Sequence, residues 1–141
     1  MKEKINFRLA VKGFIVNENN ELFVMKRASD DVQLPNIWEI PGGRLNLGED
    51  PILGVQREIR EETGLYVKVI YPMTVRHFTR QDGQVITMLI FLCKPIGGFL
   101  TISKEHSDFK WMNLKDYKKE LTDFFHKEAL LFEKLEMKRL R

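Results

Sequence analysis

Apolar and polar residues alternate over much of the first two thirds of the chain, which predicts a protein built on β-strands. The apolar, β-branched segments 7–16 and 22–26 flank the polar turn 17–20, so we expect them to form a hairpin. The other expected strands are 37–40, 67–79, 85–93 and 106–112. Polar or glycine-rich breaks separate them, namely the proline-containing loop 30–36, the triplet 41–43, the turn 81–84 and the pair Gly97-Gly98.

Two other segments carry helix signals. In the segment 51–63, Asp50 is a suitable N-cap, Pro51 fits the first helical position, and Gly64 suits the residue just past the end. In the segment 123–140, apolar residues repeat at the spacing of an amphipathic helix. Strands and two helices in a chain of 141 residues predict one domain, spanning 1–141, of the α+β or layered α/β class.

The composition is that of an ordinary globular protein, with 43% hydrophobic and 30% charged residues. No apolar run approaches the roughly 20 residues that span a bilayer, and residues 1–6 lack the apolar core of a signal peptide, so we expect no membrane association. The lone Cys93 excludes an internal disulfide and lies in an apolar strand, where we expect it to be buried and unreactive. We therefore expect a cytoplasmic protein.

The net charge of +3 raises the question of a nucleic-acid partner. Much of this charge lies near the end of the chain, in Lys134, Lys138, Arg139 and Arg141. Basic residues that close a helix also complement its dipole, and no aromatic residues are interleaved with a basic stripe. We therefore do not expect nucleic acid as a partner, whereas small polyanionic molecules are compatible with this charge.

Acidic residues cluster on one face of the expected helix 51–63. At 100° per residue, Glu58, Glu61 and Glu62 fall within an arc of about 100°. Like charges at these spacings destabilise a helix by roughly 0.2–0.5 kcal/mol per pair, so the cluster is either a solvated acidic face or a site for a hard divalent cation. The preceding Gly42-Gly43 favours the cation site, because a backbone without Cβ atoms approaches a helix and its ligand closely.

The spacing of these residues resembles the Nudix box, the signature of the Nudix hydrolase family. Gly43, Glu49 and the segment 57–65 match its pattern, G-x5-E-x7-R-E-U-x-E-E-x-G-U with U aliphatic, at every specified position. Residues 38–43 are similar to the strand and turn before the box in that family. The resemblance implies an α/β/α sandwich around a mixed sheet, with the box helix and a C-terminal helix. It also implies hydrolysis of a phosphoanhydride bond in a nucleoside diphosphate-linked substrate.

The resemblance assigns roles to the residues of the box. Glu58 and Glu62 are implied to bind Mg²⁺, for which Mn²⁺ could substitute, together with the Gly43 carbonyl. Glu61 is implied to be a further metal ligand or the catalytic base. Arg57, a candidate catalytic residue, and Glu49, a supporting residue, are implied to form an ion pair that orients the glutamates.

Candidate site residues also lie outside the box. Arg27 ends an expected strand and resembles the family arginine that faces the substrate phosphates. Glu105 lies six residues before Trp111, as does an additional metal-site glutamate in mutator-type members, so it is a candidate catalytic residue or an ordinary loop glutamate. The other candidates for substrate binding are Glu39, His77, Phe78, Phe125 and His126.

Substrate class is expected to depend on these outer residues. The segment 79–83 lacks the proline typical of many ADP-ribose hydrolases and the tyrosine often found in diadenosine-polyphosphate hydrolases. The short chain is also similar to mutator-type enzymes, so we expect hydrolysis of a nucleoside triphosphate to nucleoside monophosphate and pyrophosphate. Residues 125–127 lack the asparagine with which such enzymes often recognise an oxidised purine, which argues against that specificity.

Other functions remain open at this point. Within the same family, the alternative substrates are ADP-ribose and nucleotide sugars. A different class of function is a nucleotide-sensing domain without catalysis, although the intact acidic residues at positions 49, 58, 61 and 62 argue against it. The protein is expected to be a monomer or a homodimer.

Overall fold

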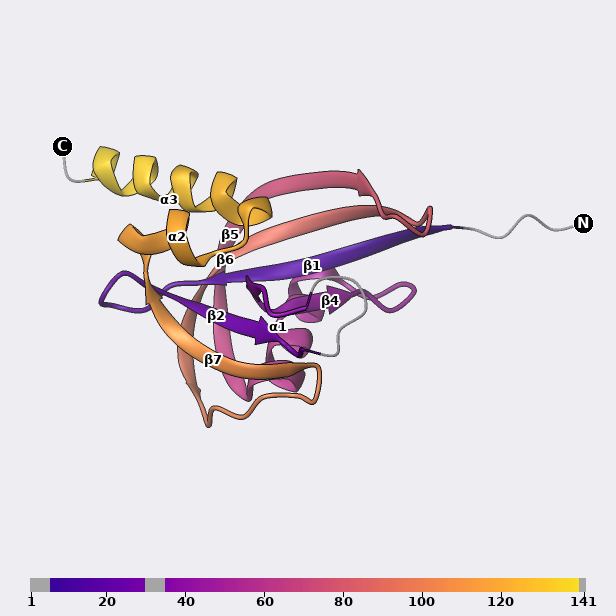
Figure 1. Cartoon of the computed structure of the whole chain (residues 1–141), viewed down its shortest axis with the longest axis horizontal. Helices are drawn as coiled ribbons and strands as arrows, with labels where there is room; N and C mark the ends of the chain where they lie inside the picture. The colour runs from indigo at the N-terminus through magenta and orange to yellow at the C-terminus, as the bar shows by residue number, and fades with distance from the viewer. Residues whose placement is uncertain (1–5, 30–34, 140–141) are drawn as a thin grey trace, which may run out of the picture.

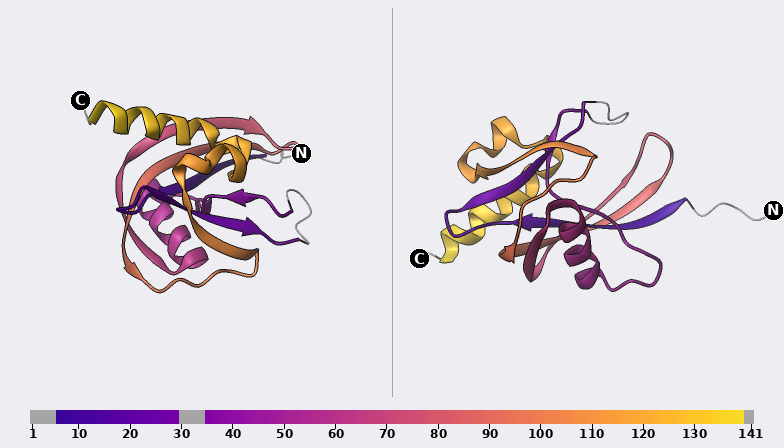
Figure 2. Two further views of the ribbon diagram at one scale, coloured as in Figure 1. Left: turned by 60° about the vertical axis from the view of Figure 1, so that its left-hand side comes forward. Right: turned by 90° about the horizontal axis from the view of Figure 1, so that it is seen from below.

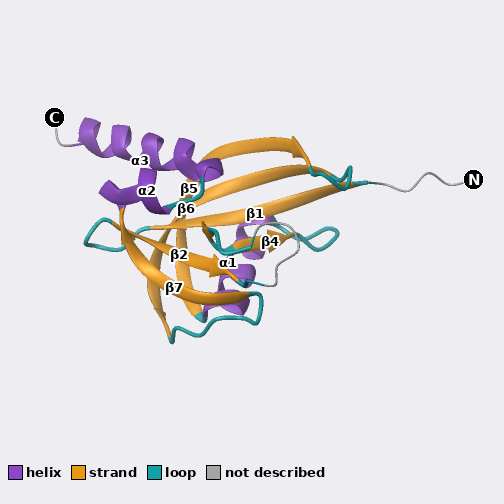
Figure 3. Cartoon of the chain, viewed as in Figure 1, coloured by secondary structure: helices purple, strands orange, loops and turns teal. Residues whose placement is uncertain are grey.

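The computed structural model describes residues 6–29 and 35–139 and arranges their strands in two sheets (Figures 1 and 3). The first sheet is mixed and has the order β4-β1-β6-β5. Its strands are β1 (Phe7–Ile15), β4 (Gly42–Arg44), β5 (Leu65–Thr79) and β6 (Val85–Gly98). The second sheet is antiparallel and has the order β3-β2-β7. Its strands are β2 (Glu21–Arg27), β3 (Trp38–Glu39) and β7 (His106–Asn113).

Helices cover this β-structure on opposite sides (Figures 1 and 2). The box helix α1 (Pro51–Thr63) lies on one side, and the last helix α3 (His126–Arg139) lies on the other. Between β7 and α3 the chain forms three short elements: η1 (Leu114–Asp116), α2 (Tyr117–Glu120) and η2 (Asp123–Phe125). The predicted layered α/β architecture is confirmed. Among the described residues, no helix is long and apolar enough to cross a membrane.

Strand β1 is the centre of the core because both of its faces are buried. Ala10 and Phe14 belong to the apolar cluster that includes Phe132 of α3. Val11 and Ile15 point to the other face, into the cluster that includes Ile59 of α1. Alternate residues of a strand face opposite sides of the sheet, so one apolar strand anchors both helical layers.

The expected hairpin between segments 7–16 and 22–26 is wrong. Strand β1 pairs with β4 and β6, whereas β2 pairs with β3 and β7 in the other sheet. Beside the polar turn, the two segments are joined by the isolated antiparallel bridge Val16↔Leu22. The turn signal is local, but both edges of β1 are taken by strands from distant parts of the sequence.

The helix signals of α1 are confirmed. The Asp50 side chain accepts a hydrogen bond from the Leu53 amide at 3.0 Å, Pro51 begins the helix, and Gly64 follows it with φ 78°. The last helix begins at His126 instead of 123, because residues 123–125 form the 3₁₀ turn η2. Residue 140, where that helix was expected to end, and most of the expected loop 30–36 lie outside the described residues.

Two glycine segments that were expected to break strands are part of strands. Strand β6 continues past Cys93 to Gly98, where Gly97 and Gly98 pair with the start of β5. Gly42-Gly43 belongs to the short strand β4, which pairs with β1. Glycine lowers strand propensity, but here the pairing partner overrides that preference.

Candidate active site

The box glutamates meet the backbone of β4. A Cβ atom added to Gly43 would lie 2.6 Å from Oε2 of Glu58, so this carboxylate rests directly against the glycine. The Gly42 amide donates a hydrogen bond to Oε2 of Glu62 at 3.3 Å. Helix α1 and strand β4 therefore bring together Gly43, Glu58 and Glu62, whereas the Glu61 side chain is 60% exposed.

Arg57 holds the acidic residues of α1 in place. Its Nε and Nη2 donate to the two oxygens of Glu49 at 2.6 and 2.8 Å, which is the ion pair that the sequence predicts. Further contacts of 3.1 Å to Glu58 and 3.0 Å to Glu61 connect it to the glutamate cluster. The hydrogen bonds from Arg57, with a smaller contribution from the Asn46 amide, lower the pKa of Glu49 to about 2. Glu49 therefore stays ionised, and its orienting role remains a prediction.

Burial disfavours negative charge on the two inner glutamates. It raises the pKa of Glu58, and it raises the pKa of Glu62 to about 7 despite the opposing field of Lys12. Two desolvated carboxylates at neighbouring positions are an unfavourable arrangement unless positive charge comes close to them.

The residues present fit a hard divalent cation. Carboxylate oxygens and a main-chain carbonyl are its preferred ligands, and Gly43 leaves the space that any Cβ would fill. Within residues 6–29 and 35–139, no three carboxylate, imidazole or thiol groups already converge on one point. An Mg²⁺ site does not require three such groups, because the ion keeps several waters and needs only one or two carboxylates. Glu58 and Glu62 are the residues that would hold the ion.

A second charged group lies beside the glutamates, around Glu39 of β3. Glu39 is only 4% exposed and accepts hydrogen bonds from Lys12 at 3.1 Å and Arg27 at 2.9 Å. Nε2 of the buried His106 lies 3.1 Å from Oε2 of Glu39, the same oxygen that accepts from Arg27. Burial raises the pKa of Glu39, but Lys12, His106 and Arg27 together lower it to about 2. Glu39 is therefore engaged by three protein groups and positions Lys12 and Arg27.

This arrangement predicts an acid-sensitive contribution to stability. The pKa of Glu39 falls from 4.5 to about 2 on folding, so its ionised form stabilises the native state above about pH 4.5. That contribution should be lost progressively as the pH falls from 4.5 toward 2. Urea unfolding between pH 7 and pH 3 should therefore show a smaller loss of stability for Glu39→Gln than for the unaltered protein. Equal pH dependence in both proteins would contradict this account of Glu39.

A cavity of about 480 Å³ opens beside these charges. One part of its wall is apolar or aromatic and includes Phe78, Phe124, Phe125, Ile86 and Met88. Another part is polar and includes Lys12, Arg27, Glu39 and Gly43. Phe124 packs edge-on against Phe78, with ring centroids 5.2 Å apart and an interplanar angle of 72°. The cavity thus joins a surface suited to a flat ring with cations suited to phosphate.

The cavity contains only some of the residues that the sequence suggests. Arg27, Glu39, Phe78 and Phe125 line it. His126 does not, because its Nε2 is 2.7 Å from the Leu121 carbonyl and its ring packs edge-on against Tyr117. The structure therefore gives no support to His126 as a substrate-binding residue. His77 also lies outside the lining, and its Nδ1 is 2.8 Å from the Thr87 hydroxyl.

Glu105 lies on the loop before β7, which runs beside the end of α1. The Ser103 amide donates to the Glu62 carbonyl at 3.2 Å, and the Glu105 carbonyl accepts from Ala28 at 3.0 Å. The Glu105 side chain is exposed, and the described residues offer it no hydrogen bond or ion pair. Its catalytic role stays a prediction.

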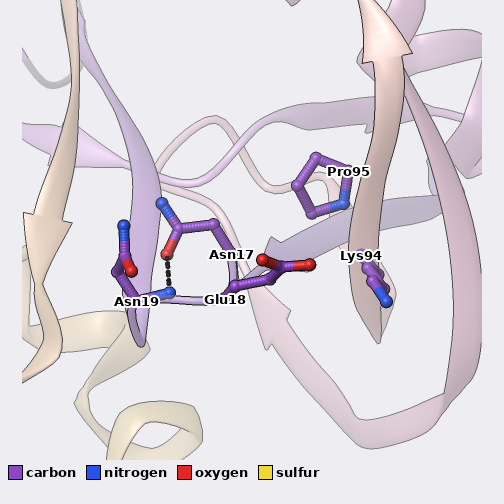
Figure 4. A pocket seen from close by; sticks show the side chains of 5 residues that line it. All are labelled: Asn17, Glu18, Asn19, Lys94 and Pro95. Carbon is purple, nitrogen blue, oxygen red and sulfur yellow. Dashed lines mark hydrogen bonds between the residues drawn. The ribbon is translucent and has the colours of Figure 1, made fainter.

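A smaller hollow of about 290 Å³ lies where β1 leaves the sheet, lined by Asn17, Glu18, Asn19, Lys94 and Pro95 (Figure 4). The Asn17 side chain is already used there, because its Oδ1 accepts from the amides of Asn19 and Glu21. This hollow therefore reflects turn geometry, and we do not assign it to the site.

The sequence-based candidates omit several residues of the site, among them Lys12, His106 and Phe124. The sequence pattern could have indicated Lys12, because it is a charged residue between the buried Ala10 and Phe14 on one face of β1. His106 had no comparable signal, since its partner Glu39 is 67 residues away. Phe124 resembled an ordinary core residue of the last helix.

Comparisons with known proteins identify the family of the chain. Residues 6–132 match the family described as the NUDIX domain. A MutT-like protein of Streptomyces ambofaciens is 33% identical over 122 residues, covering 83% of this chain and 71% of that protein. The 8-oxo-dGTP diphosphatase of Escherichia coli (strain K12) is 42% identical over 74 residues, covering 48% of this chain and 57% of that enzyme.

The fold also matches solved structures. The crystal structure of a MutT protein from Methanosarcina mazei Go1 superposes with a TM-score of 0.77 and 24% identity, covering 96% of each chain. At this identity the likeness concerns the fold, whereas the family match spans most of the sequence. The chain belongs to the Nudix family and is a hydrolase of acid anhydrides.

Proposed function

We propose that the chain hydrolyses nucleoside triphosphates to nucleoside monophosphate and pyrophosphate, with Mg²⁺ as the metal. The observation that carries this proposal is the composition of the cavity, which combines aromatic side chains with cations and Gly43. A nucleobase fits the aromatic part by stacking, which accepts any base because each has a π-face. The phosphates would then extend toward Gly43 and the box glutamates.

The cations of the cavity suit the phosphate chain. Arg27 presents a planar fork of donors that matches phosphate oxygens, and its pairing with Glu39 fixes its position. The Lys12 ammonium is bonded to Glu39 and to the Ile40 carbonyl, which leaves a third N–H for a ligand. Both side chains line the cavity together with Gly43, against which Glu58 rests, so phosphates bound there would lie near the box glutamates.

The reaction is the attack of water on the phosphoanhydride bond between the α- and β-phosphates, which separates nucleoside monophosphate from pyrophosphate. A new bond forms between the water oxygen and phosphorus, the bridging P–O bond breaks, and the proton of the water passes to a carboxylate. Glu61 and Glu105 are the two exposed acidic residues that could accept this proton. A divalent ion at Glu58 and Glu62 would neutralise the phosphate oxygens and polarise the phosphorus.

The side chains of the apolar wall bear on which nucleobase the cavity accepts. Phe124 and Phe125 occupy the start of the last helical region, and no asparagine or glutamine side chain lines the cavity among the described residues. The Escherichia coli relative is named for 8-oxo-dGTP, but this wall offers no amide that would select the oxidised base. We therefore propose ordinary nucleoside triphosphates as substrates.

A direct comparison of substrates tests the proposal. With Mg²⁺ present, nucleoside triphosphates should have a kcat/KM at least about tenfold larger than that of ADP-ribose or a nucleotide sugar. The products should be nucleoside monophosphate and pyrophosphate, identified by chromatography and phosphorus NMR. A reversed ranking would assign the chain to ADP-ribose or nucleotide-sugar hydrolysis, and binding without turnover would indicate a nucleotide sensor.

A further inference from the structure

The buried carboxylate of Glu128 is explained by neither the metal site nor helix formation. Glu128 belongs to α3 and is 0% exposed. Its oxygens accept hydrogen bonds from the Thr74 hydroxyl at 2.8 Å and from Nη1 of Arg76 at 2.9 and 3.1 Å. A buried ion pair is often no more stabilising than apolar residues of equal size. Its presence therefore suggests a role beyond the packing of α3.

Arg76 connects this carboxylate to Phe124. Its Nη1 also donates to the Phe124 carbonyl at 2.7 Å, across 48 positions of sequence. The Cζ atom of Arg76 lies 4.1 Å from the centroid of the Phe124 ring, which is a cation–π contact. Arg76 thus fixes both the main chain and the ring of Phe124, and Glu128 fixes Arg76.

Phe124 in turn is part of the cavity wall. It contacts Phe78 edge-on, and its ring centroid is 5.0 Å from that of Phe125 at an interplanar angle of 83°. It lies in the three-residue turn η2, so α-helical hydrogen bonds do not hold it in place. Without Arg76 the ring would keep its packing against neighbouring apolar side chains but lose the cation–π contact.

We propose that Arg76 and Glu128 are positioning residues that hold the Phe124 ring as the stacking surface for the nucleobase. This inference rests on the proposed function, because it assumes that the base binds in this cavity. Arg76 acts on substrate affinity through Phe124 and takes no part in the chemical step. The pair should therefore affect KM and leave kcat nearly unchanged.

Steady-state kinetics on a double-mutant cycle test this inference. Arg76→Met should raise KM for a nucleoside triphosphate about five- to tenfold and change kcat less than about twofold. In a Phe124→Leu background, the same change should alter KM less than about twofold, because the ring on which Arg76 acts is already absent. An unchanged KM, or an equal effect in both backgrounds, would overturn the proposal.

Two further variants control for folding. Arg76→Lys keeps a positive charge near Glu128 but loses the planar guanidinium, so it should also raise KM. This variant takes the place of Arg76→Met in the assay if Arg76→Met does not fold. Lys110→Met is a matched control, since Lys110 pairs with Glu120 and lies 4.5 Å from the Trp38 ring centroid outside the cavity lining. It should leave KM within about twofold of the unaltered protein, and an equal increase would make the effect of Arg76 non-specific.

A second measurement separates this inference from the proposed function. If the unaltered protein hydrolyses no nucleoside triphosphate, the proposed function fails. NMR of the unliganded protein then reports the positions of the rings. Arg76→Met should shift the ring resonances of Phe124 and Phe78. Unchanged resonances would overturn the positioning role whether or not the substrate proposal holds.

Discussion

Replacing Glu62 by Gln is expected to lower kcat by about a hundredfold or more, which corresponds to about 3 kcal/mol of activation free energy. Glutamine keeps the size of the side chain and its hydrogen bond from the Gly42 amide, but it removes the negative charge. A divalent cation would then lose one of its two inner carboxylates. Isothermal titration with Mg²⁺ should show weaker binding in the same variant.

Stability measurements separate this effect from misfolding. Glu62 is a buried acid whose negative charge is disfavoured by desolvation, so a neutral side chain should not lower the melting temperature. Glu133→Gln provides a matched control, because it makes the same chemical change at an exposed position of α3. Full activity of Glu62→Gln, or of the unaltered protein in excess chelator, would disprove the metal assignment.

Local features were predictable where the physical cause is local. Asp50 and Gly64 act within a few residues of themselves, through a side-chain hydrogen bond and a positive φ, and so the bounds of α1 were read correctly. The glutamates share a face for the same reason, since helical periodicity alone decides it. The ion pair of Arg57 and Glu49 was implied by the resemblance to the Nudix box, and the structure contains it.

Long-range features were not predictable in this way. The turn after β1 signals a reversal of the chain but does not say which strand pairs with which, and so the hairpin was wrong. Phe124 faces the cavity because Arg76 holds it, and Arg76 lies on another element. Glu128 looks like a solvent-exposed helix residue until its partner strand is known. Such pairings depend on tertiary contacts that sequence spacing does not encode.

Replacing Gly42 by Ala is expected to destabilise the protein by about 3 kcal/mol or more. Gly42 has φ 151°, and a Cβ there would lie 2.0 Å from the Val11 carbonyl oxygen and 2.7 Å from Cα of Lys12. These are backbone atoms of β1, which is buried on both faces and therefore has no direction in which to yield. Urea unfolding monitored by circular dichroism measures the loss.

Substitutions at two other glycines distinguish the effect of steric contact from the effect of backbone conformation. Gly48 also has a positive φ, 79°, but a Cβ there would meet nothing within 4 Å, so Gly48→Ala should cost only about 1 kcal/mol. Gly43 would place a Cβ against the end of the flexible Glu58 side chain, which is able to move. Gly43→Ala should therefore fold nearly as well as the unaltered protein and still lose activity, since Glu58 is displaced from its place beside the backbone. Equal stability losses at positions 42 and 48 would show that strand β4 does not depend on close approach to β1.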